Sequence, residues 1–358
     1  MVDRMLLGPA AEDRSYLGRR VEVPCIDDER KELERLAARI GIRAEAVPGV
    51  SKRRCGGKGP RSLTVEELLS LGFIDEPDLG MDQNLPESAD PQHHRKWMGG
   101  STGPTSQGFR HMVFPGIEWG SPIATFQIPF SRVGDAPGRI EVLKKASDAY
   151  LAEGNVFFGL RTLLWREHLI EDLLQPFHST QIPAVRLIPL HKILKSPVQA
   201  ASHAIANYHY AFEGLVRELV RTPWERGIQE CLEGREARAY EGGAKSLELP
   251  RSKARETGDV IYGVFGDYLK SPEVDLPAGT GRVDYDALVH SAPAELSKEE
   301  EAMLGDQDRD EYHRARARSK AMDGIRALSC GLMKEAARTF WGDLDQALSK
   351  LPSNSTGK

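Results

Sequence analysis

Residues 197–222 read PVQAASHAIANYHYAFEGLVRELVRT, the most regular stretch of the chain. Its apolar side chains follow one another at alternating steps of three and four residues: Val198, Ala201, Ile205, Tyr208, Phe212, Leu215 and Leu219. It places them on one narrow seam of an α-helix, which then needs a packing partner along its whole length. Pro197 suits the first helical turn after a Ser196 cap, and Pro223 ends the helix. The stretch therefore predicts a long packing helix.

The segment upstream, residues 156–174, carries the same rhythm on Val156, Leu160, Leu163, Ile170 and Leu174. A second apolar flank lies beside it: Phe158, Trp165, Leu169 and Leu173. A helix that is apolar over most of its circumference is buried, so we expect this one to lie at the centre. One seam position is held by Glu167, whose carboxylate stands out among apolar neighbours.

Further helices are indicated by caps and stripes. The sequence predicts helices from about residue 28 to 40, from Thr64 with Glu67 as its capping-box partner, from 139 to 151 with Gly154 at its end, and from a Ser297 to Glu300 capping box onward. The last leads into a C-terminal helix reaching Leu348, with Gly324 and Gly331 as candidate kinks. Alternation predicts a strand over 122–130 and another over 260–265.

These elements predict a mainly α (α+β) fold, with bundle-like middle and C-terminal helices and a small antiparallel β element. Four regions follow from the pattern. Residues 1–135 form an irregular N-terminal region with two short helices and a Gly/Pro-rich arm; 136–222 form the central helical core; 223–295 form a loop-rich insertion; and 296–358 form a C-terminal helical segment that packs on the core.

Composition excludes several classes. The 358 residues carry a formal charge of −5, which gives no net attraction to nucleic acid or to an anionic membrane. No stretch reaches the ~20 apolar residues of a bilayer-spanning helix, and the first residues lack the apolar run of a signal peptide. We therefore expect a soluble, cytoplasmic protein without a membrane partner. Its four cysteines are scattered, which predicts reduced thiols and neither a disulfide framework nor a zinc ribbon: Cys25, Cys55, Cys231 and Cys330.

Histidine supplies the first candidate chemistry, because five of the ten lie in the helical middle: His168, His178, His191, His203 and His209. Helical bundles hold haem and metal ions in such places. A Glu-x-x-His motif is missing, since the chain has His168 and Glu171 in reversed order. Two local pairs at i,i+4 spacing, His168 with Asp172 and His209 with Glu213, offer the alternative that these side chains satisfy local hydrogen bonds.

Glu167 and His168 are the catalytic candidates. A carboxylate in an apolar seam has its pKa raised by desolvation, which suits an acid or base catalyst. The alternative is a structural ion pair with Arg161, Arg166 or Arg186, all nearby in the sequence.

Other motifs are weaker. The adjacent His93 and His94, and the later His111, lie in a Gly/Pro-rich region without the carboxylate of a two-histidine iron site, so the sequence assigns no metal ligand. The glycines before and after Lys58 fail the P-loop spacing. A basic cluster could contact nucleic-acid phosphates or be a solvated loop: Lys52, Arg53, Arg54, Lys58 and Arg61.

Three functions remain. The first is a self-assembling subunit of coat, nucleocapsid or scaffold type, a homo-oligomer joined through the central helices and the N-terminal arm. It rests on strong packing helices, long Gly/Pro-rich segments and the lack of a coherent catalytic motif. The alternative is a haem- or metal-dependent enzyme that uses Glu167, His168, His178, His203 and His209. The third is a nucleic-acid-binding protein that works through the basic cluster from Lys52 to Arg61. The sequence leaves the cofactor and the choice among the three open.

Overall fold

The computed structural model describes residues 9–12, 14–39, 55–57, 62–70, 111–113, 117–120, 125–128, 134, 136–180, 190–195, 207–209, 211–217, 219, 229–232, 236–242, 246, 248–253, 258, 261, 293–349 and 351. This part of the chain is mainly helical, with two antiparallel two-stranded sheets. The prediction of a mainly α fold with a small antiparallel β element is confirmed.

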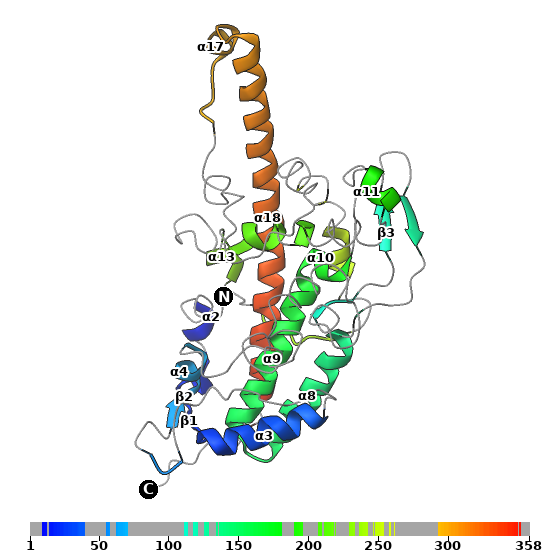
Figure 1. The fold of residues 1–358 in the computed structure, drawn as a ribbon. Coiled ribbons are helices and arrows are strands. Elements are labelled where there is room, and N and C mark those ends of the chain that lie inside the picture. The colour runs from blue at the N-terminus through cyan, green and yellow to red at the C-terminus, as the bar shows by residue number, and fades with distance from the viewer. Residues whose placement is uncertain are drawn as a thin grey trace.

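Three helices form the centre of the molecule: α8 (Ala136–Ala152), α9 (Val156–Leu174) and α18 (Asp306–Leu348). Figure 1 shows α9 between the other two, running antiparallel to both. Almost every residue of α9 is buried, as its apolar circumference predicts. The tight link between α8 and α9 contains Gly154, the predicted end of α8. The central helix α9 therefore packs between α8 and α18.

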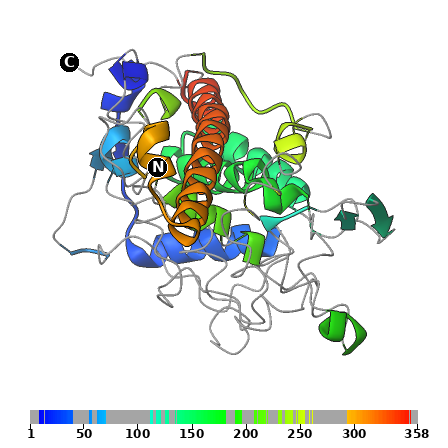
Figure 2. The same ribbon diagram turned by 90° about the horizontal axis from the view of Figure 1, so that it is seen from above.

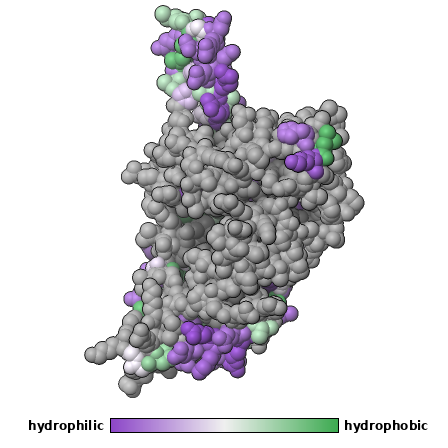
Figure 3. Space-filling model, in the orientation of Figure 1, coloured by the Kyte–Doolittle hydropathy of each residue, from purple (hydrophilic) through white to green (hydrophobic). Residues whose placement is uncertain are grey.

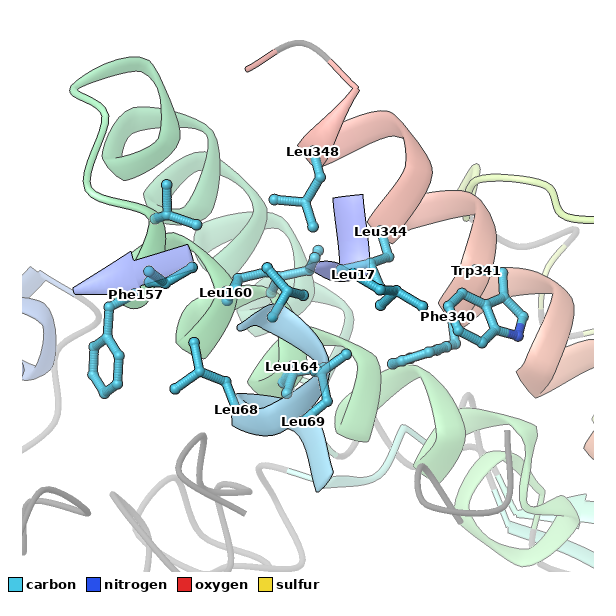
Figure 4. Close-up of a cluster of buried hydrophobic side chains, with 14 of the residues drawn as sticks. Leu17, Leu68, Leu69, Phe157, Leu160, Leu164, Phe340, Trp341, Leu344 and Leu348 are labelled. Carbon is cyan, nitrogen blue, oxygen red and sulfur yellow. The ribbon is translucent and has the colours of Figure 1, made fainter. Parts of the chain in front are cut away.

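The larger apolar core lies between the N-terminal half of α9 and the C-terminal half of α18 (Figure 4). Leu160 and Leu164 of α9 face Phe340 and Leu344 of α18 in one cluster. The second core cluster forms where α8 packs on the C-terminal half of α9. Its members include Ile140, Leu143, Trp165, Leu169 and Leu173. The candidate site described below lies beside this second cluster.

The N-terminal elements close the lower end of the bundle. They are α2 (Pro9–Glu12), the 3-10 helix η1 (Ser15–Gly18), β1 (Arg20–Glu22), α3 (Ile26–Arg39), β2 (Ser62–Thr64) and α4 (Val65–Ser70). The strands β1 and β2 pair antiparallel. Thr64 Oγ1 accepts a hydrogen bond from the Glu67 amide at 3.0 Å, and Glu67 Oε2 accepts one from the Thr64 amide at 2.7 Å. This pair confirms the predicted capping box. The helix α3 crosses the ends of α8 and α9 (Figure 1).

The other elements are short. β3 (Ile117–Gly120) pairs antiparallel with β4 (Thr125–Ile128), which lies within the predicted strand over 122–130. The helices are α10 (Pro176–Ser179), α11 (Leu190–Lys195), α13 (Gln229–Leu232) and α17 (Lys298–Ala302). Ser297 and Glu300 form the predicted capping box at the start of α17. The final helix α18 continues through Gly324 and Gly331.

The long helix predicted over 197–222 is confirmed where the structure describes it. Residues 207–209, 211–217 and 219 are helical. Tyr208, Phe212, Leu215 and Leu219 of the predicted seam are all buried. The first half of the seam, from Val198 to Ile205, lies outside the described residues.

Two sequence-based expectations are wrong. Cys25 is bonded to Cys55, and Cys231 of α13 is bonded to Cys330 of α18, with Cα atoms 4.9 Å apart in each pair. The prediction of reduced thiols failed because partners 30 and 99 residues apart leave no motif in the sequence. The strand predicted over 260–265 is also wrong at Ile261, which is helical and fully buried. A segment that is buried on all sides has no polar, solvent-facing positions. Its sequence therefore lacks the alternation of apolar and polar residues that distinguishes a strand from a helix.

The N-terminal part of α18 extends beyond the body of the molecule (Figure 1). From Asp306 to Ala321 none of its residues is buried. The segment around α17 folds back beside it (Figure 2), with the Leu296 amide donating to the Tyr312 hydroxyl at 3.0 Å. Among the described residues, no helix combines the length and apolar content needed to cross a bilayer.

Candidate metal centre

One group of donor atoms lies at the C-terminal end of α9. His168 and Asp172 are one turn apart on α9, so both side chains leave the helix on the same side. His111 reaches them from the short segment 111–113. Its Nδ1 lies 2.6 Å from Oδ2 of Asp172 and 3.3 Å from Nε2 of His168. The third side of this triangle, from His168 Nε2 to Asp172 Oδ2, is also 3.3 Å. We call these three residues site A.

The triangle of site A has the size of a metal-ligand set. Ligand atoms about 2.1 Å from a tetrahedral ion lie about 3.4 Å from each other. Two of the three edges match this value within 0.1 Å, and the 2.6 Å edge is a hydrogen-bond distance that an ion would widen. The ring of His111 is buried, and the side chains of His168 and Asp172 keep 14% and 15% exposure. Site A is therefore nearly enclosed.

A second group repeats the pattern beside it. His209 and Glu213 are again one turn apart on the helix over 207–219, and His178 comes from α10. Glu213 Oε1 lies 3.0 Å from Nε2 of His209 and 3.4 Å from Nε2 of His178. The two imidazole rings stack with centroids 4.5 Å apart and planes 12° apart. We call these three residues site B.

The two sites share structural support. Nδ1 of His178 lies 3.2 Å from the backbone oxygen of His111, and the Val113 amide donates to the backbone oxygen of His178 at 2.9 Å. Oδ1 of Asp172 lies 3.4 Å from the same His178 Nδ1. The segment that carries His111 is thus fixed to α10, which carries a residue of the other site.

Burial and charge act against each other on the two carboxyls. Burial alone raises the pKa of Asp172, but the surrounding imidazoles outweigh it, His168 most strongly, and hold that pKa well below its usual range. Burial likewise raises the pKa of Glu213, and His209 and His178 more than reverse this and lower it. Both side chains are therefore carboxylates that can ligate a cation near neutral pH.

Glu167 belongs to a different network. Nη1 of Arg166 donates to Glu167 Oε1 at 3.0 Å, and Arg166 also pairs with Asp343 of α18. All three side chains are buried. Burial and the charge of Asp343 raise the pKa of Glu167, against the opposing effect of Arg166. The structure places Glu167 in contact with Arg166, as the ion-pair alternative expects, and the raised pKa is what the acid–base alternative expects, so both stay predictions.

The structure brings together three histidines named from the sequence, His168, His178 and His209. His203 lies outside the described residues, and so do His93, His94 and the basic cluster: Lys52, Arg53, Arg54, Lys58 and Arg61. His191 lies exposed on α11, apart from both sites. A further grouping, Cys25 and Cys55 with Asp28, has both sulfurs in a disulfide.

Sequence reasoning missed His111, Asp172 and Glu213 as candidate ligands. The signal for the two carboxylates was present, because each histidine-carboxylate pair has the i,i+4 spacing that turns both side chains to one side. It was interpreted as local hydrogen bonding. No spacing could have joined His111 to Asp172, since 61 residues separate them.

Comparison with known proteins adds no family to this geometry: no protein-family profile, curated protein or solved structure matches the chain.

Proposed function

We propose that this protein is a metal-dependent enzyme whose reaction centre is a divalent transition-metal ion held by His111, His168 and Asp172. The observation that carries the proposal is the triangle of two imidazole nitrogens and one carboxylate oxygen, with sides of 2.6, 3.3 and 3.3 Å. Two imidazoles and one carboxylate are the donor set of non-haem Fe(II) oxygenases and of several Zn(II) hydrolases. Three protein ligands leave coordination positions open for water and substrate, which is what separates a catalytic from a structural site.

The arrangement favours a bare ion over haem. A haem iron takes protein groups only at its two axial positions, on opposite faces of the macrocycle. In site A the three donor atoms lie within 3.3 Å of one another, on one side of any ion they share. The rings of His111 and His168 meet edge to face, with centroids 5.2 Å apart, which leaves no space for a porphyrin between them.

The test is the metal content of purified protein. The chain is freed of metal with a chelator, reconstituted separately with Fe(II) under anaerobic conditions, Zn(II) or Mn(II), desalted and analysed for metal. We expect stoichiometric retention of at least one of these ions by the native protein and loss of an ion in His168→Gln. The exposed His191→Gln on α11 is the matched control and should retain the native content. A native protein that retains none of the three ions would refute the proposal.

A second candidate function is self-association, the first expectation from the sequence. The observation that favours it is the extended N-terminal part of α18, which has no buried residue from Asp306 to Ala321. Its surface is mainly hydrophilic (Figure 3). Acidic side chains at Asp306, Asp308, Asp310 and Glu311 precede basic ones at Arg314, Arg316, Arg318 and Lys320. Two such segments from separate copies, placed antiparallel, bring opposite charges together.

Native mass spectrometry at micromolar concentration and low salt tests this role. A self-associating subunit gives a discrete oligomer that weakens as salt is raised, because exposed charges are screened. Reversal of the basic segment by Arg314→Glu and Arg318→Glu should then abolish the oligomer. A monomer under all conditions would exclude self-association and leave the metal proposal untouched.

A further inference from the structure

The geometry of the second group of donors, site B, indicates a cation site of its own. Its three donor atoms come from α10 and from one turn of the helix over 207–219, and they all lie within 4.8 Å of one another. The edge from Glu213 Oε1 to His178 Nε2 is 3.4 Å, the separation of about 3.4 Å between ligands of a tetrahedral ion, and the edge to His209 Nε2 is shorter at 3.0 Å. The rings of His178 and His209 stack nearly parallel, and the Nε2 atoms of both lie near the same carboxylate oxygen.

The hydrogen bonding of His178 identifies which of its nitrogens can bind an ion. Its Nδ1 lies 3.2 Å from the backbone oxygen of His111, and a carbonyl oxygen only accepts, so Nδ1 carries the hydrogen. In the neutral ring the lone pair is then on Nε2. That atom is buried and has no hydrogen-bond partner within the described part of the chain. A histidine held at one nitrogen by a carbonyl, with the other nitrogen facing a carboxylate, has the usual arrangement of a metal ligand.

Asp172 connects the two sites. Its Oδ2 belongs to site A, at 2.6 Å from His111 and 3.3 Å from His168. Its Oδ1 lies 3.4 Å from Nδ1 of His178, the nitrogen opposite the one that faces Glu213. One oxygen therefore serves site A, while the other lies within ion-pair distance of a site B histidine whose N–H donates to the His111 carbonyl. Loss of an outer partner of a metal-bound histidine lowers metal affinity about 10–100-fold.

We propose that His178, His209 and Glu213 hold a second divalent cation, and that Asp172 couples the two sites by ligating the first ion and orienting His178 toward the second. This inference rests on the proposed function at site A and extends it to a centre with two ions. Glu213 keeps 37% exposure, so the second ion would be reached from solvent.

The experiment is a Zn(II) titration of the chelator-treated full-length chain, followed by calorimetry and by metal analysis of the desalted protein. We expect two ions per native chain. Glu213→Gln and His209→Gln should each bind one ion, and His168→Gln should bind one ion with the affinity of native site B. The control His191→Gln should bind two. Circular dichroism of the metal-free variants checks that each has folded.

The outcomes separate the two proposals. No ion in the native chain would overturn both, whereas one ion that Glu213→Gln and His209→Gln retain and His168→Gln loses would overturn only the second site. One ion lost in the site B variants and kept in His168→Gln would overturn site A as the reaction centre. The coupling has its own measure: Asp172→Asn should lower the site B affinity about 10–100-fold relative to His168→Gln. Equal site B affinities in Asp172→Asn and His168→Gln would refute the coupling.

Discussion

Two carboxylates on α9, the buried Glu167 and the partly exposed Asp172, lie little more than one turn apart and have very different partners. Glu167 is paired with Arg166, whose guanidinium also pairs with Asp343 of α18. In the described part of the chain, the ionic partners of Asp172 are three histidines, at 2.6, 3.3 and 3.4 Å. A guanidinium keeps its charge and has no lone pair, so the first network is closed to metal ions. An imidazole can exchange its proton for a metal, so the second is open to them.

A separate arginine pair lies nearer the N-terminal end of α9. Arg161 pairs with Glu29 of α3, and both side chains are fully buried. Since α3 crosses the ends of α8 and α9, this pair fixes the N-terminal layer to the bundle (Figure 1). The comparison therefore separates the arginine pairs of α9, which we expect to stabilise the fold, from its histidine group, which the proposed function uses. Four predictions test that division.

The largest effect is expected from Arg161→Met. It leaves the Glu29 carboxylate buried without the guanidinium, and removal of one partner of a buried ion pair costs about 3–5 kcal/mol of unfolding free energy. Urea unfolding of the metal-free protein measures it. The double variant Arg161→Met/Glu29→Met should recover most of the loss, because it removes both buried charges. In contrast, His168→Gln should cost only about 1 kcal/mol without metal. If His168→Gln lost more unfolding free energy than Arg161→Met, the histidine group and not the arginine pair would be the one that stabilises the fold.

The second prediction concerns the disulfide from α13 to α18, which belongs to neither donor group. The pair Cys231→Ser/Cys330→Ser should lose about 2–4 kcal/mol, because the unfolded chain regains the freedom of a long loop. Cys25→Ser/Cys55→Ser is the matched variant: its partners are 30 residues apart against 99, so it should lose about 1 kcal/mol less. Zn(II) affinity should stay native in both. A thiol assay that finds four free cysteines in the native chain would contradict both bridges.

The sequence predicts the helices well and the site only in part, for one physical reason. Periodicity records which face of an element is buried, and α9 and the helix over 207–219 are confirmed where described because their seams are long. The contact of Glu167 with Arg166 could be predicted because the two residues are adjacent in the sequence. The pairing of His111 with Asp172, and of Cys231 with Cys330, depends on how distant segments meet. Local spacing carries no record of such contacts, so the complete donor sets emerge only from the fold.

The third prediction concerns stabilisation by metal. An ion that binds only the folded chain adds about 2.7 kcal/mol to its stability at a free concentration of 100 times the dissociation constant. We expect this increase with Zn(II) in the native protein and a smaller one in His168→Gln. Glu167→Gln should keep the full increase, although it is adjacent in sequence, because Glu167 contacts Arg166 and not the site. Thermal unfolding with and without Zn(II) measures the difference. If Glu167→Gln lost the stability increase with Zn(II), Glu167 would take part in metal binding, and the separation of the two networks would be wrong.

The smallest effects come from two glycines, one beside each network. At Gly134 the backbone has φ +101°, and an added Cβ would lie 2.0 Å from the Met112 oxygen, next to His111. At Gly342 an added Cβ would lie 2.1 Å from the Arg238 carbonyl carbon, next to Asp343. Each substitution by alanine therefore forces a backbone shift, which costs about 1–3 kcal/mol.

The two alanine variants should differ in metal binding. Gly134→Ala displaces the segment that carries His111, so we expect Zn(II) affinity at site A to fall about 10–100-fold, the range found when support of a metal ligand is lost. Gly342→Ala displaces residues 236–242 from α18 and should leave that affinity native, because the arginine network holds no ligand. Calorimetric titration of the two variants measures the contrast. Equal affinities would mean that the support of His111 does not depend on the contact of Met112 with Gly134, and a loss in Gly342→Ala alone would place the metal at the arginine network.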